Sequence, residues 1–294
     1  MNLLFNEAPR IVINVTRYFY SETFPLLLQL TISFFFGIPD YMERSIGEWL
    51  KYLNSNYVAY LRNKKVLKAL KPEEVEHLKP VVTCNKKWYG SVYGGFYINP
   101  DLLSENSVIY SFGIGTDITF DLKCIKKHRV NVYGFDPTPK SIDWVKSRDI
   151  HPNFHFYEFG ISNETGFQEF YLPDRPKGVS GSMIANPIVS EKLKIKVAMK
   201  SFEDLAEQLG HKKIDVIKMD IEGSEYDVID SIINSTIIVN QYLLEFHDRF
   251  YDINHPKSKE VVEKLSAKGY VIYAHSMNYE EISFIKKSLL DPIN

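Results

Sequence analysis

The sequence predicts an α/β fold preceded by a mainly helical region. From residue 108 onward, apolar strand-like segments alternate with amphipathic helices, which is typical of a sheet covered by crossover helices on both faces. In the N-terminal part, apolar residues recur three and four positions apart, as in Met42–Leu70. We therefore predict two domains: a helical region with a lid or connector over residues 1–99, and the α/β domain over residues 100–294.

Seven strands and five helices are expected in the α/β part. The strands are predicted at residues 107–115, 131–138, 153–162, 214–223, 241–248, 270–276 and 281–288. The helices are predicted at residues 117–128, 139–148, 201–210, 224–235 and 258–269. Residues 166–200 interrupt this alternation and indicate an added hairpin and loop. Upstream, the glycine- and aromatic-rich segment Trp88–Pro100 indicates a lid or connector, with ligand contact as the alternative.

Composition and cysteine usage exclude several classes of protein. The chain has 294 residues, of which 24% are charged, and a formal net charge of −2, which is ordinary for a globular protein. No long basic run is interleaved with aromatics, so a nucleic-acid partner is not expected. Cys84 and Cys124 match no metal or redox spacing, which favours reducing surroundings, with a single disulfide as the alternative. We expect a cytoplasmic protein.

The most apolar stretch is Pro25–Pro39 in the N-terminal region. It is interrupted by Gln29, Thr31 and Ser33, and it is shorter than the roughly 20 apolar residues that a spanning helix needs. No basic flank precedes it, which argues against a signal peptide. We interpret it as a buried or partner-facing helix. A peripheral membrane contact and a homodimer contact are the alternatives.

The first two strand ends point to a ribose-bearing cofactor. Gly113 and Gly115 follow the first strand, where they permit a tight turn and a close approach of a ligand to the backbone. Asp136 ends the second strand about 21 residues beyond Gly115, at the spacing at which an acid accepts hydrogen bonds from ribose hydroxyls. The alternative is that Asp136 caps the helix that follows it.

The fourth and fifth strand ends concentrate acidic residues and a histidine. The segment KMDIEGSEY, Lys218–Tyr226, ends a buried strand with Asp220, Glu222 and Glu225. Glu222 and Glu225 also suit the positive end of a helix dipole, and we adopt that reading for Glu225 while treating Asp220 as functional. On the next strand Glu245 and His247 share a face, and His247 is either structural or a base.

These segments, above all Lys218–Glu225, resemble the FkbM-type family of S-adenosylmethionine-dependent methyltransferases. The resemblance extends over Val108–Ser288 and implies a Rossmann-like class I methyltransferase sheet of about seven mostly parallel strands, the last one antiparallel. It also implies S-adenosylmethionine as the cofactor. The expected reaction is methyl transfer to a hydroxyl of a sugar, glycan or secondary metabolite.

The resemblance assigns a role to each cofactor-binding position. Gly113 and Gly115 would lie against the methionine part of S-adenosylmethionine, and Asp136 would hold the ribose. Phe159 and Gly160 would border the adenine.

Two of the remaining positions are predicted to act on the methionine end or on the acceptor. Asp220 would face the amino group of the cofactor or the acceptor. Asp117 is also placed among the cofactor-binding residues, although it stands where a small residue is common in the family. Ser111 is a second departure, because an acidic residue often precedes the glycine turn.

For catalysis, His247 and Asp220 are the predicted general bases that take the proton of a hydroxyl acceptor. We predict no metal ion, and an Asp220–Glu245–His247 metal site is the alternative. The glycan acceptor rests mainly on the resemblance. Two other functions compete: a catalytically silent cofactor-binding module held to a membrane or partner, and a nicotinamide-dependent oxidoreductase.

Overall fold

The computed structural model describes residues 46–175, 178–252 and 255–290, and the chain divides into two compact units, residues 1–52 and 53–294. The apolar stretch Pro25–Pro39 lies outside the described residues, and so does any membrane or dimer contact that it makes. Every helix within the described ranges is too short or too polar to cross a bilayer. The domain boundary predicted at residue 99 stays a prediction.

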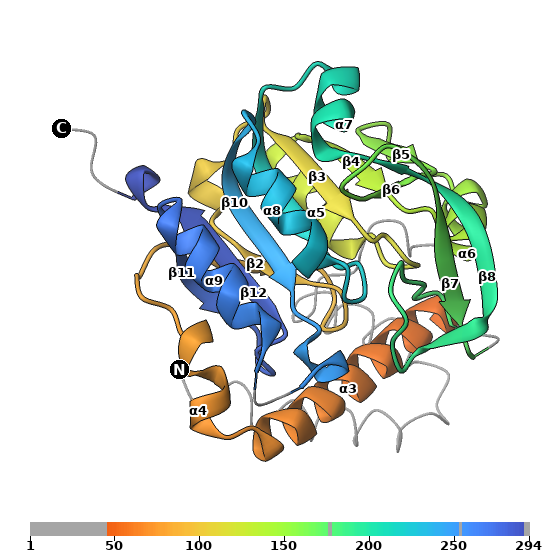
Figure 1. The fold of residues 1–294 in the computed structure, drawn as a ribbon, viewed down its shortest axis with the longest axis horizontal. Coiled ribbons are helices and arrows are strands. Elements are labelled where there is room, and N and C mark those ends of the chain that lie inside the picture. The colour runs from red at the N-terminus through yellow and green to blue at the C-terminus, as the bar shows by residue number, and fades with distance from the viewer. Residues whose placement is uncertain (1–45, 176–177, 253–254, 291–294) are drawn as a thin grey trace, which may run out of the picture. The chain divides into compact units, whose positions relative to one another are not determined.

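A seven-stranded sheet forms the centre of the second unit, as the sequence predicts (Figure 1). Its strand order is β11-β12-β10-β9-β3-β4-β5, and the five strands from β10 to β5 run parallel. Strand β12 is antiparallel to both of its neighbours, which confirms the expected reversal of the last strand. The strands are β3 (Val108–Phe112), β4 (Asn131–Phe135), β5 (Phe154–Tyr157), β9 (Lys213–Met219), β10 (Ile238–Glu245), β11 (Tyr270–His275) and β12 (Glu281–Lys286).

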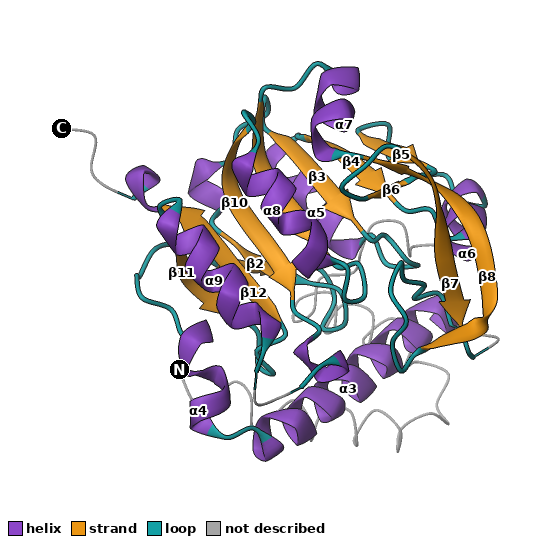
Figure 2. Ribbon diagram, in the orientation of Figure 1, coloured by secondary structure: helices purple, strands orange, loops and turns teal. Residues whose placement is uncertain are grey.

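Helices cover both faces of this sheet (Figure 2). Two adjacent residues of β3 show this: Tyr110 packs in the core with α7, α8 and α9, whereas Ile109 packs on the opposite side with α5, α6 and the strands at Lys87–Tyr89 and Phe96–Ile98. Both faces of the strand are therefore apolar, as expected for a buried parallel sheet. The helices are α3 (Ile46–Ala69), α4 (Pro72–Val75), α5 (Thr119–His128), α6 (Pro139–Lys146), α7 (Phe202–Leu209), α8 (Glu225–Asn234) and α9 (Lys257–Ala267).

Two hairpins and four short 3₁₀ turns complete the described part. Strands β1 (Lys87–Tyr89) and β2 (Phe96–Ile98) pair within the predicted connector. Strands β7 (Gly166–Pro173) and β8 (Val189–Lys200) form the predicted inserted hairpin, and β6 (Gly160–Ile161) joins β8. The 3₁₀ turns are η2 (Glu76–Leu78), η3 (Pro100–Leu102), η4 (Asp248–Phe250) and η5 (Lys287–Leu289).

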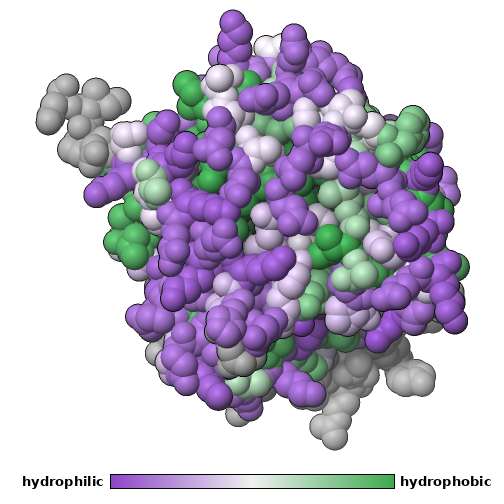
Figure 3. Space-filling view, in the orientation of Figure 1, coloured by the Kyte–Doolittle hydropathy of each residue, from purple (hydrophilic) through white to green (hydrophobic). Residues whose placement is uncertain are grey.

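The apolar residues are largely interior. The face seen in Figure 3 is mostly hydrophilic, and hydrophobic residues show there in small separate areas. Cys124 is buried in the core on the α5 side, and Cys84 and Cys124 are both free thiols. The pairing of these cysteines in a single disulfide, the alternative left open by the sequence, is therefore not made.

Candidate active site

A pocket opens at the carboxyl ends of β3, β4 and β9, which is where open α/β sheets bind their ligands. The turn after β3 forms one wall, and the end of β9 forms another. The inserted hairpin contributes Val179–Gly181, and the β1–β2 connection contributes Tyr93 and Gly94. The predicted cofactor-binding residues that line this pocket are Gly113, Gly115, Asp117, Asp136, Gly160 and Asp220.

The two glycines of the turn after β3 serve different purposes. Gly113 has a φ of +79°, and a Cβ atom there would lie 1.6 Å from the carbonyl oxygen of Asp220. The backbones of β3 and β9 therefore meet so closely that no side chain fits between them. Gly115 has a φ of +54°, but the nearest atom to its Cβ position is 3.9 Å away, on Val179. This open space leaves the backbone of the turn accessible to a ligand.

Asp136 holds the glycine turn in place. Its Oδ2 accepts hydrogen bonds from the backbone N–H groups of Ile114 (3.0 Å) and Gly115 (2.8 Å), and its Oδ1 accepts one from Thr138 (2.8 Å). The N-cap of α6 is Thr138, so Asp136 does not take the capping position that was its alternative role. Burial raises the pKa of Asp136, against the effect of these N–H donors. Asp136 lines the pocket, and its predicted contact with the ribose stays a prediction.

Of the predicted cofactor-binding residues Asp117 and Phe159, only Asp117 lines the pocket. Asp117 lines the pocket, where its Oδ2 accepts a hydrogen bond from Ser91 Oγ (2.6 Å) and its Oδ1 accepts one from the Thr119 N–H (2.8 Å). It thereby ties the β1–β2 connection to the glycine turn. Phe159 packs against Phe135, with ring centroids 5.6 Å apart, and is not among the lining residues. Its predicted adenine contact stays a prediction.

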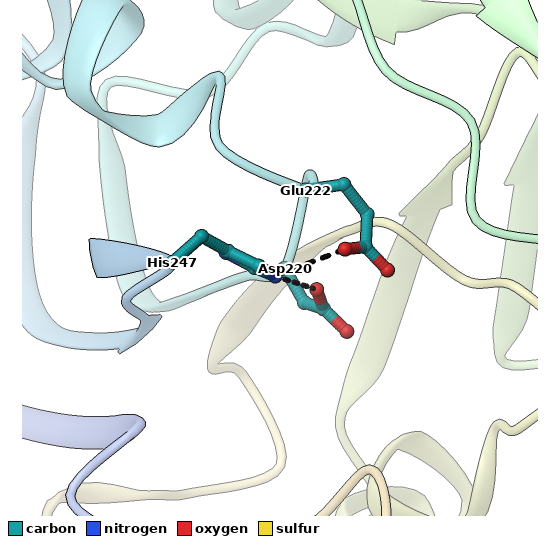
Figure 4. A group of neighbouring side chains, drawn as sticks. All are labelled: Asp220, Glu222 and His247. Atoms are coloured by element: carbon teal, nitrogen blue, oxygen red, sulfur yellow. Dashed lines mark ion pairs between the residues drawn. The ribbon is translucent and has the colours of Figure 1, made fainter. Parts of the chain in front are cut away.

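His247 lies among four carboxylates, Asp220, Glu222, Glu225 and Glu245, which we call the acidic cluster. Figure 4 shows His247 with two of them, Asp220 and Glu222. The imidazole is fully buried, whereas the side chains of Asp220 and Glu222 are 25% and 14% exposed and line the pocket. His247 Nε2 lies 3.1 Å from Glu222 Oε2, 3.6 Å from Glu245 Oε1 and 3.7 Å from Asp220 Oδ1. The structure thus brings the two predicted bases together, but only Asp220 faces the pocket.

Glu225 fixes the orientation of His247, a role that the sequence did not reveal. Its Oε1 accepts hydrogen bonds from the backbone N–H of His247 (3.1 Å) and bonds the ring at Nδ1 (2.8 Å). Its Oε2 accepts a bond from the Gly223 N–H (2.9 Å). Glu225 does begin α8, where an acid is favourable, so its position alone explains the residue type. The sequence therefore offers no reason to expect its contact with His247, 22 positions away.

Glu222 has a backbone conformation that is uncommon for a residue with a side chain. Its φ is +53°, in the left-handed region that costs a non-glycine residue about 1–2 kcal/mol. Two side chains of the loop between β7 and β8 hold its carbonyl oxygen: Ser182 Oγ donates at 2.9 Å and Asn186 Nδ2 at 3.1 Å. This conformation accompanies the placement of the Glu222 carboxylate beside His247.

The charges in the acidic cluster shift one another. Burial acts to lower the pKa of His247, but Glu225, Glu222 and Glu245 outweigh it and hold that pKa well above its usual value. Burial raises the pKa of Glu245 well above normal, and burial together with Glu222 raises that of Asp220. Burial opposes the ionisation of Glu222 too, but His247 and Arg249 outweigh it and lower its pKa. The four carboxylates thus interact with three nearby cationic side chains, His247, Arg249 and Lys218.

Comparison with known proteins identifies the family. The sequence model of the methyltransferase FkbM domain matches residues 106–272, which is more than half of the chain. The chain belongs to the FkbM methyltransferase family. This match confirms the resemblance drawn from Lys218–Glu225, and S-adenosylmethionine is the cofactor that the family uses.

Two curated proteins are similar to this FkbM methyltransferase. One is the hexuronic acid methyltransferase AglP of Haloferax volcanii, 26% identical over 147 residues, which are 49% of this chain and 57% of AglP. The other is the human probable methyltransferase-like protein 24, 21% identical over 221 residues, covering 70% of this chain and 53% of that protein. The chain thus spans little more than half the length of the curated relatives that it matches.

Solved structures give more distant similarities. The fibrillarin pre-rRNA processing protein of Methanococcus jannaschii is 14% identical with a TM-score of 0.38, covering 63% of this chain and 68% of that one. Aeropyrum pernix fibrillarin, solved with natively bound S-adenosylmethionine, is 11% identical with a TM-score of 0.35, covering 62% and 66%. Similarity at this level indicates nothing about the acceptor of the FkbM methyltransferase.

The pocket suits the cofactor that the family uses. The accessible turn at Gly115 and the acid at Asp136 are the features that a methionine group and a ribose require. Tyr93 also lines the pocket, in agreement with the ligand-contact alternative for Trp88–Pro100, and the inserted loop adds Val179 and Met183. They come from the β1–β2 connection and the inserted loop, and no spacing rule relates those segments to the strand ends.

Proposed function

We propose that this FkbM methyltransferase methylates a hydroxyl group of a sugar or glycan. The observation that carries the proposal is the position of two partly exposed carboxylates, Asp220 and Glu222, in the wall of the pocket that contains the glycine turn. Carboxylates accept hydrogen bonds from hydroxyl groups, so this wall favours an acceptor with several of them. The similarity to a hexuronic acid methyltransferase supports the same class of acceptor.

Asp220 is the residue that we assign to proton removal. When bound, S-adenosylmethionine supplies a methyl group on a sulfonium; transfer forms the new C–O bond as the C–S electron pair returns to sulfur. The acceptor hydroxyl must lose its proton in this reaction, and Asp220 reaches the pocket while His247 is fully buried.

Other residues bind the cofactor and exclude water from the pocket. Asp136 and the turn that it holds would fix the cofactor, and Gly160 with Ile161 closes the side of the pocket nearest β6. The inserted loop, through Val179 and Met183, covers the pocket with apolar side chains. Because alignment of the reacting atoms supplies much of the rate in such a displacement, these contacts serve positioning.

The test begins with calorimetric titration of S-adenosylmethionine into the full chain. We expect micromolar binding, weakened by at least about tenfold in Asp136→Ala, because that change removes the ribose acceptor and releases the glycine turn. Asp143→Ala is the matched control, since it removes an exposed carboxylate from the neighbouring helix α6. Unchanged affinity in Asp136→Ala would contradict this site.

The acceptor is then sought by incubating the protein with radiolabelled S-adenosylmethionine and a panel of hexoses, uronic acids and glycans. A labelled, base-stable ether product that requires Asp220 supports the proposal. Binding of the cofactor without transfer to any sugar would favour the catalytically silent module instead. The family match leaves no support for the nicotinamide-dependent oxidoreductase.

A further inference from the structure

Three potential ligand atoms of the acidic cluster converge on one point. Within the part of the chain that the structure describes, Asp220, Glu222 and His247 each offer an atom, and these atoms all lie within 4.8 Å of one another. Two ligands bound about 2.1 Å from one metal ion and at right angles to each other lie about 3 Å apart. The distances from His247 Nε2, 3.1 Å to Glu222 and 3.7 Å to Asp220, are close to that separation.

The same three atoms also lack hydrogen bonds, which is a separate observation. Asp220 Oδ1, Glu222 Oε2 and His247 Nε2 are buried and have no hydrogen-bond partner among the described residues. His247 and Glu222 approach to 3.1 Å without the geometry of a hydrogen bond. Buried polar atoms normally have partners, and an unsatisfied group costs free energy. Three such atoms pointing toward one another indicate a ligand that bonds to all of them.

The surroundings of His247 are those of a metal-bound imidazole. A histidine that binds a metal through one ring nitrogen usually donates its other N–H to a carboxylate. Glu225 Oε1 lies 2.8 Å from Nδ1 and is itself buried, so a proton on Nδ1 leaves the lone pair of Nε2 directed at the acidic cluster. Figure 4 shows the imidazole of His247 turned toward the carboxylates of Asp220 and Glu222.

A second acidic group nearby has these properties only in part, since Glu281 Oε2 is its one buried oxygen without a hydrogen-bond partner among the described residues. Glu245, Glu280 and Glu281 also bring three carboxylate atoms together. Glu280, however, already bonds the guanidinium of Arg249 (2.8 Å) and pairs with Arg62 (3.4 Å), so resident cations satisfy it. This contrast separates the two groups and supplies an internal control.

We propose that Asp220, Glu222 and His247 bind a divalent cation of the Mn²⁺ type, at the edge of the pocket. Mixed carboxylate and imidazole ligands suit first-row divalent ions better than Mg²⁺ or Ca²⁺, which prefer oxygen alone. The cation interacts with the negatively charged carboxylates and holds an oxygen of the acceptor; this last role rests on the proposed function. The inference replaces our sequence-based prediction that no metal ion is bound. It also substitutes Glu222 for Glu245 in the alternative ligand set.

The competing explanation is a protonated His247 that acts as a counterion of the cluster together with Arg249, which lies 3.7 Å from Glu245 and 3.9 Å from Glu222. In that case Nε2 carries a proton and binds no metal. The two explanations differ in whether a metal acquires a nitrogen ligand from His247. Electron paramagnetic resonance of Mn²⁺ reports this without any enzymatic assay.

The experiment titrates Mn²⁺ into the metal-stripped full chain and follows the free-ion signal. We expect one bound ion in the wild type, and affinity weakened by about tenfold or more in Glu222→Gln and in His247→Gln. Glu280→Gln is the matched control and should change the affinity by less than about threefold. In pulsed spectra of the wild type, we expect modulation from a histidine nitrogen, which disappears in His247→Gln.

Circular dichroism of the same samples shows whether each variant is folded, and calorimetry with S-adenosylmethionine measures cofactor binding. Cofactor binding by wild type and variants, with no Mn²⁺ bound by the wild type, would overturn this inference and leave the proposed function standing. Loss of Mn²⁺ in Glu280→Gln but not in Glu222→Gln would also overturn it. Mn²⁺ binding without cofactor binding would count against the proposed function, and the cation site would stand.

Discussion

The carboxylates at the two sides of the pocket are satisfied in different ways. On the β4 side, Asp136 accepts three backbone N–H bonds of 2.8 to 3.0 Å, so its charge is used to hold a turn. On the β9 and β10 side, Asp220 and Glu222 each have a buried oxygen without a hydrogen bond. The Nε2 atom of His247 beside them is also buried and lacks a hydrogen bond. The first side is complete without a ligand, whereas the second is not.

This difference shows that the number of acidic residues at a strand end does not by itself identify their purpose. A carboxylate surrounded by N–H donors stabilises the protein's own backbone, and a cofactor can then bind to the surface that it shapes. Carboxylates that face one another are costly unless a cation lies between them. The two sides meet at Gly113, where the β3 turn touches the backbone of Asp220.

Gly113→Ala is expected to have the largest effect, because it forces the two sides apart. The new Cβ would overlap the carbonyl oxygen of Asp220, which belongs to the backbone, at a φ of +79°. We expect the free energy of unfolding to fall by more than about 3 kcal/mol, with loss of cofactor binding. Chemical denaturation followed by circular dichroism measures the change.

Gly115→Ala is the matched control for that experiment. Its φ of +54° is also unfavourable for alanine, but its Cβ would enter open space. The expected loss of stability is about 1 kcal/mol. Equal effects of the two substitutions would show that backbone conformation, rather than the contact between the two sides, determines the result.

Glu225→Gln is expected to weaken Mn²⁺ binding on the β9 and β10 side without affecting cofactor binding on the β4 side. The amide keeps the size of the side chain but removes the charge that orients His247, so we expect Mn²⁺ affinity to fall about 10- to 100-fold. Affinity for S-adenosylmethionine should stay within about twofold, because Glu225 does not line the pocket. Titrations of the same protein sample with both ligands measure the two affinities. A parallel loss of both would mean that Glu225 supports the whole site and not one side of it.

The fold and the cofactor side were predictable because they follow from local patterns. Strand ends such as Gly113–Gly115 and Asp136 lie at one edge of any parallel sheet, whatever the details of packing. The domain match over residues 106–272 agrees with the segments that carried the resemblance.

The acidic cluster was only partly predictable. Asp220, Glu245 and His247 follow from strand ends and periodicity, but the helix that follows explains Glu225 and is one of the explanations for Glu222. Their contacts depend on a left-handed φ at Glu222 and on side chains from the inserted loop. A sequence pattern contains no information on which distant loop holds a given carbonyl group, so these roles required the structure.

The smallest effect is expected for Ser182→Ala, in the loop between β7 and β8. Ser182 Oγ donates to the Glu222 carbonyl and accepts a bond from the Ile184 N–H (3.1 Å), and Ser182→Ala removes both bonds. We expect a loss of about 1 kcal/mol of stability and a two- to fivefold loss of Mn²⁺ affinity, since Asn186 still bonds the same carbonyl. Ser190→Ala, on strand β8 of the same insertion, is the control and should leave Mn²⁺ affinity unchanged. If Ser182→Ala also leaves it unchanged, the loop does not position Glu222, and the left-handed backbone alone directs its carboxylate toward His247.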